Sequence, residues 1–224
     1  MYSFTLEQRQ VALRRLVFFH IIIIAASNYL VQFPFSIGEI HATWGALSFP
    51  FIFVATDLTV RIFGKEQARK IVFYAMIPAL ILSYAISVLF QNGSWTQWSD
   101  LATFNLFVIR IVVASMLAYL LGQLLDITVF NRLRRLKHWW IAPSASSILG
   151  SAADTFAFFG IAFFHSPDAF MAQNWVHIAW TDYAFKLVIN LLFFLPIYGV
   201  LLRYVMNYLV AMNEKSNHQN MLTE

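Results

Sequence analysis

Residues 182–190 read DYAFKLVIN, and they lie inside a run, from about residue 176 to 210, that is otherwise almost entirely apolar and aromatic. A run of this length and composition is typical of a helix that crosses a membrane. Asp182, Lys186 and Asn190 follow one another at intervals of four, so a helix places them on one face. A charged side chain in mid-membrane costs roughly 2.5–3.5 kcal/mol, and such residues usually face a cavity or one another. The stretch therefore predicts a membrane helix whose polar face points into a bundle.

The composition of the whole chain predicts the same class. Of its 224 residues 60% are hydrophobic and 12% are charged, and its mean hydropathy is +0.65. A soluble domain carries about 25% charged residues. Runs such as HIIIIAA are continuous, whereas a transmembrane β-barrel alternates apolar and polar positions. We predict an all-α integral membrane protein.

The length of the apolar runs indicates how many times the chain crosses the membrane. A bilayer core of about 30 Å requires roughly 20 apolar residues per helix, and the chain has about six such runs. They lie near residues 13–33, 46–63, 70–90, 102–125, 140–164 and 177–208. The first run also resembles a signal peptide, but it continues past Asn28, which favours an anchor. We expect one six-helix domain over residues 1–213 and a mobile cytoplasmic tail over 214–224.

The distribution of basic residues predicts the orientation. Lys and Arg gather before the first run, between the second and third, and between the fourth and fifth, at Arg9, Arg14, Arg15, Lys65, Arg69, Lys70, Arg132, Arg134, Arg135 and Lys137. The alternate loops, near 34–45, 91–101 and 165–176, have none. Since cytoplasmic loops carry the excess of positive charge, both termini should be cytoplasmic. The basic cluster VFNRLRRLKHWW is explained by this topology and by anionic lipids, so we do not expect it to bind nucleic acid.

Several polar residues within the runs suggest a binding pocket. With this topology and a rise of about 1.5 Å per residue, Lys186 and Asp154 both fall about 14 Å below the outer boundary. Ser147, Ser151 and Asp154 share a helical face. The candidate substrate-binding residues, which share this part of the bundle, are Asn28, Gln32, Asn105, Arg110, Asp154, Asp182, Lys186 and Asn190. The alternative is that the charges form buried salt bridges that lock helix packing.

Asp57 and Arg61 form a separate pair near the cytoplasmic end of the second run. Their spacing of four allows a direct ion pair, and Arg61 can extend to the interface. A structural pair and a cytoplasmic gate are both open interpretations. Asp126 precedes the basic cluster, and we expect it to be an interfacial partner for Arg132 or Arg134.

Other classes of function lack the residues that they need. The chain has no cysteine, and its six histidines show no metal-binding spacing. It has no GxSxG, Walker loop or GxGxxG motif. We therefore expect neither an enzyme nor a bound cofactor or metal.

Motifs along most of the chain resemble a known family. SNYLVQ, TWGALSFPFIFVATDLTVRIFG, FNLFVIR, VFNRLRR, HSPDAFMA, DYAFK and FFLPIYGVLL occur in this order. They are similar to the bacterial queuosine precursor transporters of the YhhQ type, within the vitamin uptake transporter family. The resemblance implies a six-helix inner-membrane importer of 7-cyano-7-deazaguanine, and of its aminomethyl relative, for salvage into tRNA. It also implies a fold like that of the substrate-binding subunits of energy-coupling-factor importers, working without their ATPase module.

The implied substrate suggests roles for the polar residues. A deazaguanine presents a ring N–H beside an exocyclic amine, and a carboxylate can accept both as parallel hydrogen bonds. Asp154 is our first choice for this carboxylate and Asp182 the second, while Lys186, Arg110 or Asn28 could donate to the ring carbonyl. The polar edge would be completed by Gln32, Asn105 and Asn190. The alternative function is a substrate-binding subunit of an energy-coupling-factor importer for another heterocycle or vitamin. Energy coupling, oligomeric state and the aromatic platform for the ring stay open.

Overall fold

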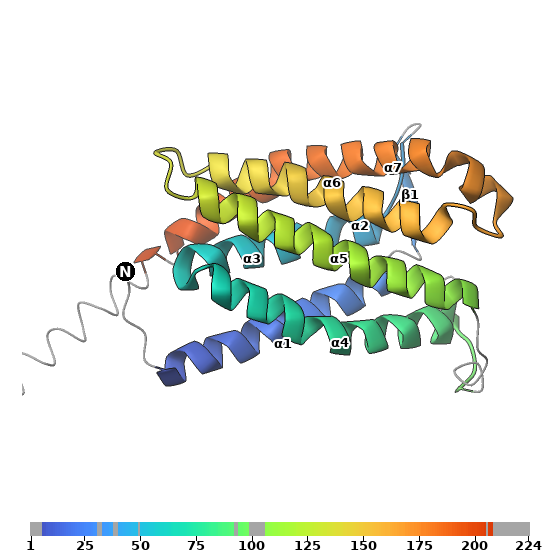
Figure 1. The fold of residues 1–224 in the computed structure, drawn as a ribbon, viewed down its shortest axis with the longest axis horizontal. Helices are drawn as coiled ribbons and strands as arrows, with labels where there is room; N and C mark the ends of the chain where they lie inside the picture. The colour runs from blue at the N-terminus through green and yellow to red at the C-terminus, as the bar shows by residue number, and fades with distance from the viewer. Residues whose placement is uncertain are drawn as a thin grey trace, which may run out of the picture.

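The computed structural model describes residues 6–30, 33–37, 40–48, 50–91, 94–98, 106–204 and 206–207. In this part of the chain the protein is a bundle of long helices whose axes run roughly side by side (Figure 1). Five of its helices are long and apolar enough to cross a membrane. They are α1 (Leu6–Leu30), α4 (Lys65–Leu89), α5 (Leu106–Leu133), α6 (Ile141–Phe163) and α7 (Ala169–Ile189). The predicted all-α membrane bundle is confirmed, and the expected tail lies outside the described residues.

The second apolar run is helical on both sides of residue 49, which lies outside the described residues. The short α2 (Trp44–Ser48) precedes it and α3 (Pro50–Phe63) follows it. Proline is well suited to the first position of a helix, because its missing N–H has no partner there. α3 packs against α4 and α5, and the prediction that this run is a sixth span stays a prediction.

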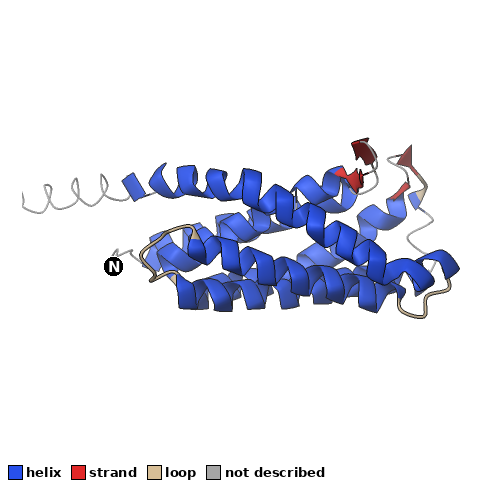
Figure 2. Cartoon of the chain, turned by 90° about the horizontal axis from the view of Figure 1, so that it is seen from above, coloured by secondary structure: helices blue, strands red, loops and turns tan. Residues whose placement is uncertain are grey.

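Two short hairpins occupy the segments that we expected to be loops. β1 (Pro34–Ile37) pairs antiparallel with β2 (Ile40–Thr43), and β3 (Phe90–Gln91) pairs with β4 (Ser94–Trp95). Both hairpins lie at the end of the bundle opposite the N-terminus (Figure 2). The expected loop at 165–176 is mostly helical, because α7 already begins at Ala169 and not near 177. Asp168 caps this helix, with its Oδ1 accepting the Met171 N–H at 3.0 Å.

The basic segments lie together at the other end. The start of α1, the turn at Gly64 between α3 and α4, and the 134–140 segment between α5 and α6 all lie at that end (Figure 1). Arg134 joins two of them, since its guanidinium donates to the carbonyls of Val60 and Arg61 at 2.5 and 3.3 Å. Desolvation, and then the charges of Arg135 and Arg61, lower the pKa of Arg134. This grouping agrees with the predicted topology, and the assignment of this end to the cytoplasm stays a prediction.

A buried polar chain ties three helices together behind the site. His20 of α1 donates through Nδ1 to the Leu16 carbonyl at 2.8 Å, and its Nε2 lies 3.2 Å from the Thr56 hydroxyl of α3. Thr56 in turn donates to Oε1 of Gln123 on α5 at 2.6 Å. Hydrogen bonds between helices are a source of cohesion in a membrane, where apolar packing alone gives little preference over lipid. These hydrogen bonds hold α3 against α1 and α5.

Candidate functional site

A charged cluster joins α6 to α7 in the middle of the bundle. The Lys186 ammonium of α7 lies 2.7 Å from Asp182, one turn earlier on the same helix, and 3.7 Å from Asp154 of α6. It also donates to the Thr155 hydroxyl at 3.2 Å, and Thr155 donates to Asp182 at 3.4 Å. The predicted face of residues 182–190 therefore meets the predicted face of α6, and Lys186 and Asp154 lie at one depth as expected.

The cluster continues by one helical turn to Asn190. The Asn190 amide donates to the Ser151 hydroxyl of α6 at 3.3 Å, and its side chain is buried. Asn190 also begins η2 (Asn190–Phe194), a π-helical segment in which the Leu195 N–H bonds to the Asn190 carbonyl. Pro196 follows directly and has no N–H for the preceding turn, which accounts for the wider winding here. Such segments occur frequently at functional sites.

A small cavity opens beside Asn190. Asp57 of α3, Ser147 of α6 and Asn190 supply polar groups to its wall, and Phe53 and Tyr198 supply aromatic rings. Small-molecule sites combine mostly apolar walls with a few placed polar groups. Asn190 thus belongs both to the charged cluster and to the wall of this cavity.

Arg61 lies beside this cavity, toward the basic end of the bundle, because it bonds to the lining residue Tyr198. The Arg61 Nε donates to the Tyr198 hydroxyl at 2.7 Å, and the guanidinium lies over the rings of Phe130 and Tyr198. Trp139 stacks on Tyr198, with 6.2 Å between ring centroids. Our expectation that Arg61 pairs directly with Asp57 is wrong, because in the described part of the chain the ion pairs within 4 Å all involve Lys186. Arg61 bonds to Tyr198 because that hydroxyl lies within reach across the helix interface.

Two buried carboxyl groups lie at the wall of this cavity, where Asp57 lines it and Asp126 lies beside Asp57. Asp57 is 3% exposed and accepts a hydrogen bond from Ser146 at 3.3 Å. Asp126 of α5 is fully buried, its nearest polar neighbours are Asp57 and Ser146, and no donor reaches either carboxylate oxygen. The expectation that Asp126 is an interfacial partner of Arg132 or Arg134 is wrong, since α5 continues to Leu133 and turns Asp126 inward.

A close crossing of α5 and α6 holds these groups in place. A Cβ at Gly122 of α5 would stand 2.9 Å from the Asp154 Cβ, and one at Gly150 of α6 would stand 3.0 Å from the Asp126 Cβ. Gly122 thus faces Asp154, which follows Gly150 by four residues. Gly150 faces Asp126, which follows Gly122 by four residues. Small residues at a crossing let two membrane helices approach closely.

The remaining predicted site residues are not gathered at the cluster. Arg110 of α5 donates to the carbonyls of Ile161, Phe164 and His165 and so caps the end of α6. The side chain of Asn28 is not described, and Gln32 and Asn105 lie outside the described residues. In the described ranges, no three His, Asp or Glu side chains gather that could hold a metal ion.

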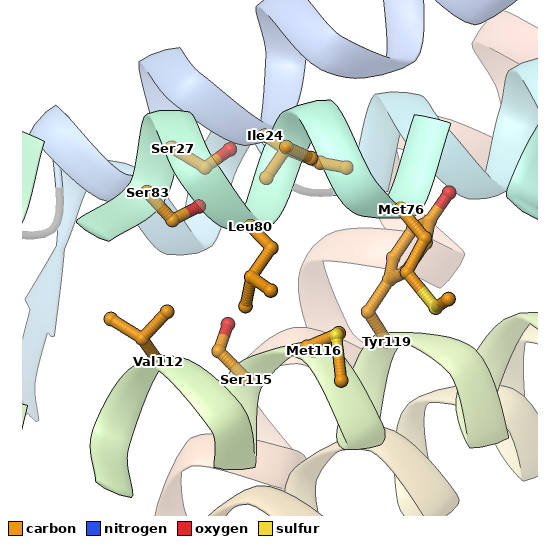
Figure 3. Close-up of a pocket in the computed structure, with 10 residues that line it drawn as sticks. Ile24, Ser27, Met76, Leu80, Ser83, Val112, Ser115, Met116 and Tyr119 are labelled. Carbon is orange, nitrogen blue, oxygen red and sulfur yellow. The ribbon is translucent and has the colours of Figure 1, made fainter. Parts of the chain in front are cut away.

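A second small cavity lies between α1, α4 and α5. Side chains from all three helices point into it (Figure 3). Its lining includes the hydroxyls of Ser27, Ser115 and Tyr119 but no charged group, and the buried Tyr119 hydroxyl has no hydrogen-bond partner. Since the first cavity adjoins the charged cluster and this one does not, we place the candidate site at the first.

Comparisons with known proteins match most of the chain to a family of transporters. Residues 43–201 match the family model described as putative vitamin uptake transporter. A queuosine precursor transporter from Escherichia coli is 58% identical over 211 residues, which cover 94% of this chain and 96% of the relative. A probable queuosine precursor transporter from Haemophilus influenzae is 54% identical, with 91% and 92% covered, and one from Bacillus subtilis is 29% identical, with 67% and 68% covered. No solved structure gives a significant match.

Proposed function

The chain belongs to the vitamin uptake transporter family and is a transporter, not an enzyme, and from this premise we propose that it imports 7-cyano-7-deazaguanine, and its aminomethyl relative, for conversion to queuosine in tRNA. It is a multi-pass protein of the bacterial inner membrane. The coarser statement, that it imports a queuosine precursor, follows from relatives that are more than half identical over nearly the whole chain. The identity of the precursor is our own proposal.

The observation that carries this proposal is the unequal sharing of Lys186 between two carboxylates. Lys186 contacts Asp182 at 2.7 Å, whereas Asp154 lies at 3.7 Å, beyond normal hydrogen-bond length. The Asp154 carboxylate can therefore turn to an incoming ligand without leaving the lysine unpaired. A ring N–H and the adjacent exocyclic amine would donate two parallel hydrogen bonds to it. Lys186 would then donate to the neighbouring ring carbonyl.

The route inward follows from the order of polar groups along α6 and α7. From the depth at which Asp154 lies in the bundle, the substrate would pass Ser151 and Asn190 and enter the cavity lined by Phe53 and Tyr198. Its flat ring could pack on these aromatic walls. The Arg61–Tyr198 hydrogen bond at the basic end would then act as the cytoplasmic gate, with Asp57 in the cavity behind it.

The experiment that tests this proposal measures queuosine in tRNA. Bacterial cells that cannot make deazapurines and lack their own transporter receive trace external 7-cyano-7-deazaguanine, with and without this chain. We expect queuosine to appear only when the chain is expressed. Absence of queuosine, with the protein confirmed in the membrane, would contradict the proposed substrate. Restoration that requires an added energy-coupling partner would favour the alternative, a substrate-binding subunit.

A further inference from the structure

The Asp57–Asp126 pair is a buried acidic site that the substrate path does not use directly. The two carboxyls come from α3 and α5, are 3% and 0% exposed, and lie beside each other. Among the described residues, Ser146 of α6 donates a hydrogen bond to Asp57 of this pair. Both oxygens of Asp126 are buried with no donor.

Two ionised carboxylates in this environment would repel each other without compensation. No cation of the described residues lies within 4 Å of either, since the nearby Arg61 is held by the Tyr198 hydroxyl. Like charges that share a buried site cannot both ionise, so one of the two retains a proton. A proton on one carboxyl also supplies the hydrogen-bond donor that Asp126 lacks.

The surroundings connect this pair to both the gate and the substrate cluster. Asp57 lines the same cavity as Asn190, and Asp126 faces Gly150, one turn before Asp154 on α6. The titratable groups that act on the pair are Arg61 of α3 and Tyr198 of the segment after η2. From α1, His20 bonds to Thr56, the residue before Asp57.

We propose that the Asp57–Asp126 pair is a proton-binding site that couples import to the proton gradient. In the closed arrangement the two carboxyls share one proton. That proton enters from the outer aqueous side as the substrate binds, forms an O–H bond on one carboxylate, and leaves to cytoplasmic water when Arg61 separates from Tyr198. One proton and one substrate thus move inward together. This inference depends on the proposed function, because it names the driving force for the same transport.

The test uses the full chain, purified and reconstituted in lipid vesicles, with radiolabelled 7-cyano-7-deazaguanine. The first measurement is exchange of label between the two sides at equal pH. The second is accumulation of label with the outside buffer made more acidic than the inside, with and without a protonophore. The test variant is Asp126→Asn, whose amide provides the missing donor to Asp57 and cannot bind a proton. The matched control is Asp168→Asn, the same change at an exposed helix cap, where asparagine also caps well.

We expect the unmodified chain and Asp168→Asn to accumulate substrate in response to the acidic exterior, and the protonophore to abolish this. Asp126→Asn should retain exchange, with the label levelling off at its external concentration. If the unmodified chain exchanges label but does not accumulate it in response to the proton gradient, the inference is overturned and the proposed function stands. Accumulation driven by a sodium gradient would have the same consequence. Gradient-driven accumulation that persists in Asp126→Asn would also overturn it. If the unmodified chain shows no exchange, the proposed function itself fails.

Discussion

Gly122 of α5 and Asp154 of α6 lie so close that a side chain on the glycine would meet the aspartate directly. A Cβ at Gly122 would stand 2.9 Å from the Asp154 Cβ and 3.0 Å from the Gly150 carbonyl oxygen. Both neighbours belong to the packed α5–α6 interface and are not flexible chain ends. The position of Asp154 relative to Lys186 therefore depends on the absence of a side chain at Gly122.

Gly122→Ala should consequently impair transport. Overpacking of this kind costs about 1–3 kcal/mol, and the added methyl group must displace α6 at the level of Asp154. We expect a lower melting temperature in detergent and a large loss of uptake in cells. Gly160→Ala is the matched control, since its Cβ would meet Trp175 at an ordinary 3.7 Å. Equal uptake by the two variants would show that the close crossing does not set the site.

Asp154→Asn should abolish substrate binding while the protein stays folded. The amide keeps one acceptor oxygen, but its NH2 group is a donor and would face the second of the two ligand donors, the ring N–H or the amine. Hydrogen bonds to charged groups contribute about 1.5–3 kcal/mol each, so affinity should fall by about 100-fold or more. Lys186 keeps Asp182 at 2.7 Å, and melting should change little. Titration calorimetry with 7-cyano-7-deazaguanine measures the affinity, and normal binding by this variant would remove Asp154 from the site.

The sequence was sufficient to predict the side-chain faces that meet at the cluster. Intervals of four placed Asp182, Lys186 and Asn190 on one face, and the depth along the helix matched Lys186 to Asp154, which the 3.7 Å contact confirms. Periodicity does not say which neighbouring helix a face meets. Arg110 has the depth of a site residue, but it caps the end of α6, because unpaired carbonyls there lie within its reach.

Other features of the structure could have been predicted from residue types that a hydropathy analysis does not consider. Pro50 is typical of the first position of a helix, here α3, and the Ser-Pro-Asp sequence ending at Asp168 marked an early start for α7. Asp126 was assigned to the interface because it precedes a basic cluster. Its position four residues after Gly122, on the face that packs against α6, is the signal that could have placed it inside.

Tyr198→Phe should weaken closure at the basic end of the bundle. The change removes the acceptor of the Arg61 Nε hydrogen bond but keeps the ring on which Trp139 stacks. Loss of such a bond costs about 1–2 kcal/mol, which shifts a closed–open equilibrium by about 5- to 30-fold. We expect faster efflux of labelled substrate from preloaded vesicles. Tyr204→Phe, at an exposed position six residues later, should leave efflux unchanged. Identical rates for both variants would argue against a gate at Arg61.

The variant Tyr119→Phe tests which of the two cavities binds substrate. The Tyr119 hydroxyl is buried in the wall of the α1–α4–α5 cavity with no hydrogen-bond partner, and leaving such a group unsatisfied costs about 1–3 kcal/mol. If substrate does not use this cavity, removal of the hydroxyl should preserve uptake and raise the melting temperature. If substrate binds there, the hydroxyl would find its partner in the ligand, and the variant would lose affinity instead. Uptake in cells and thermal unfolding with and without 7-cyano-7-deazaguanine separate the two cases. We expect preserved uptake, because the cavity lacks the charged groups that Asp154 and Lys186 bring to the other site.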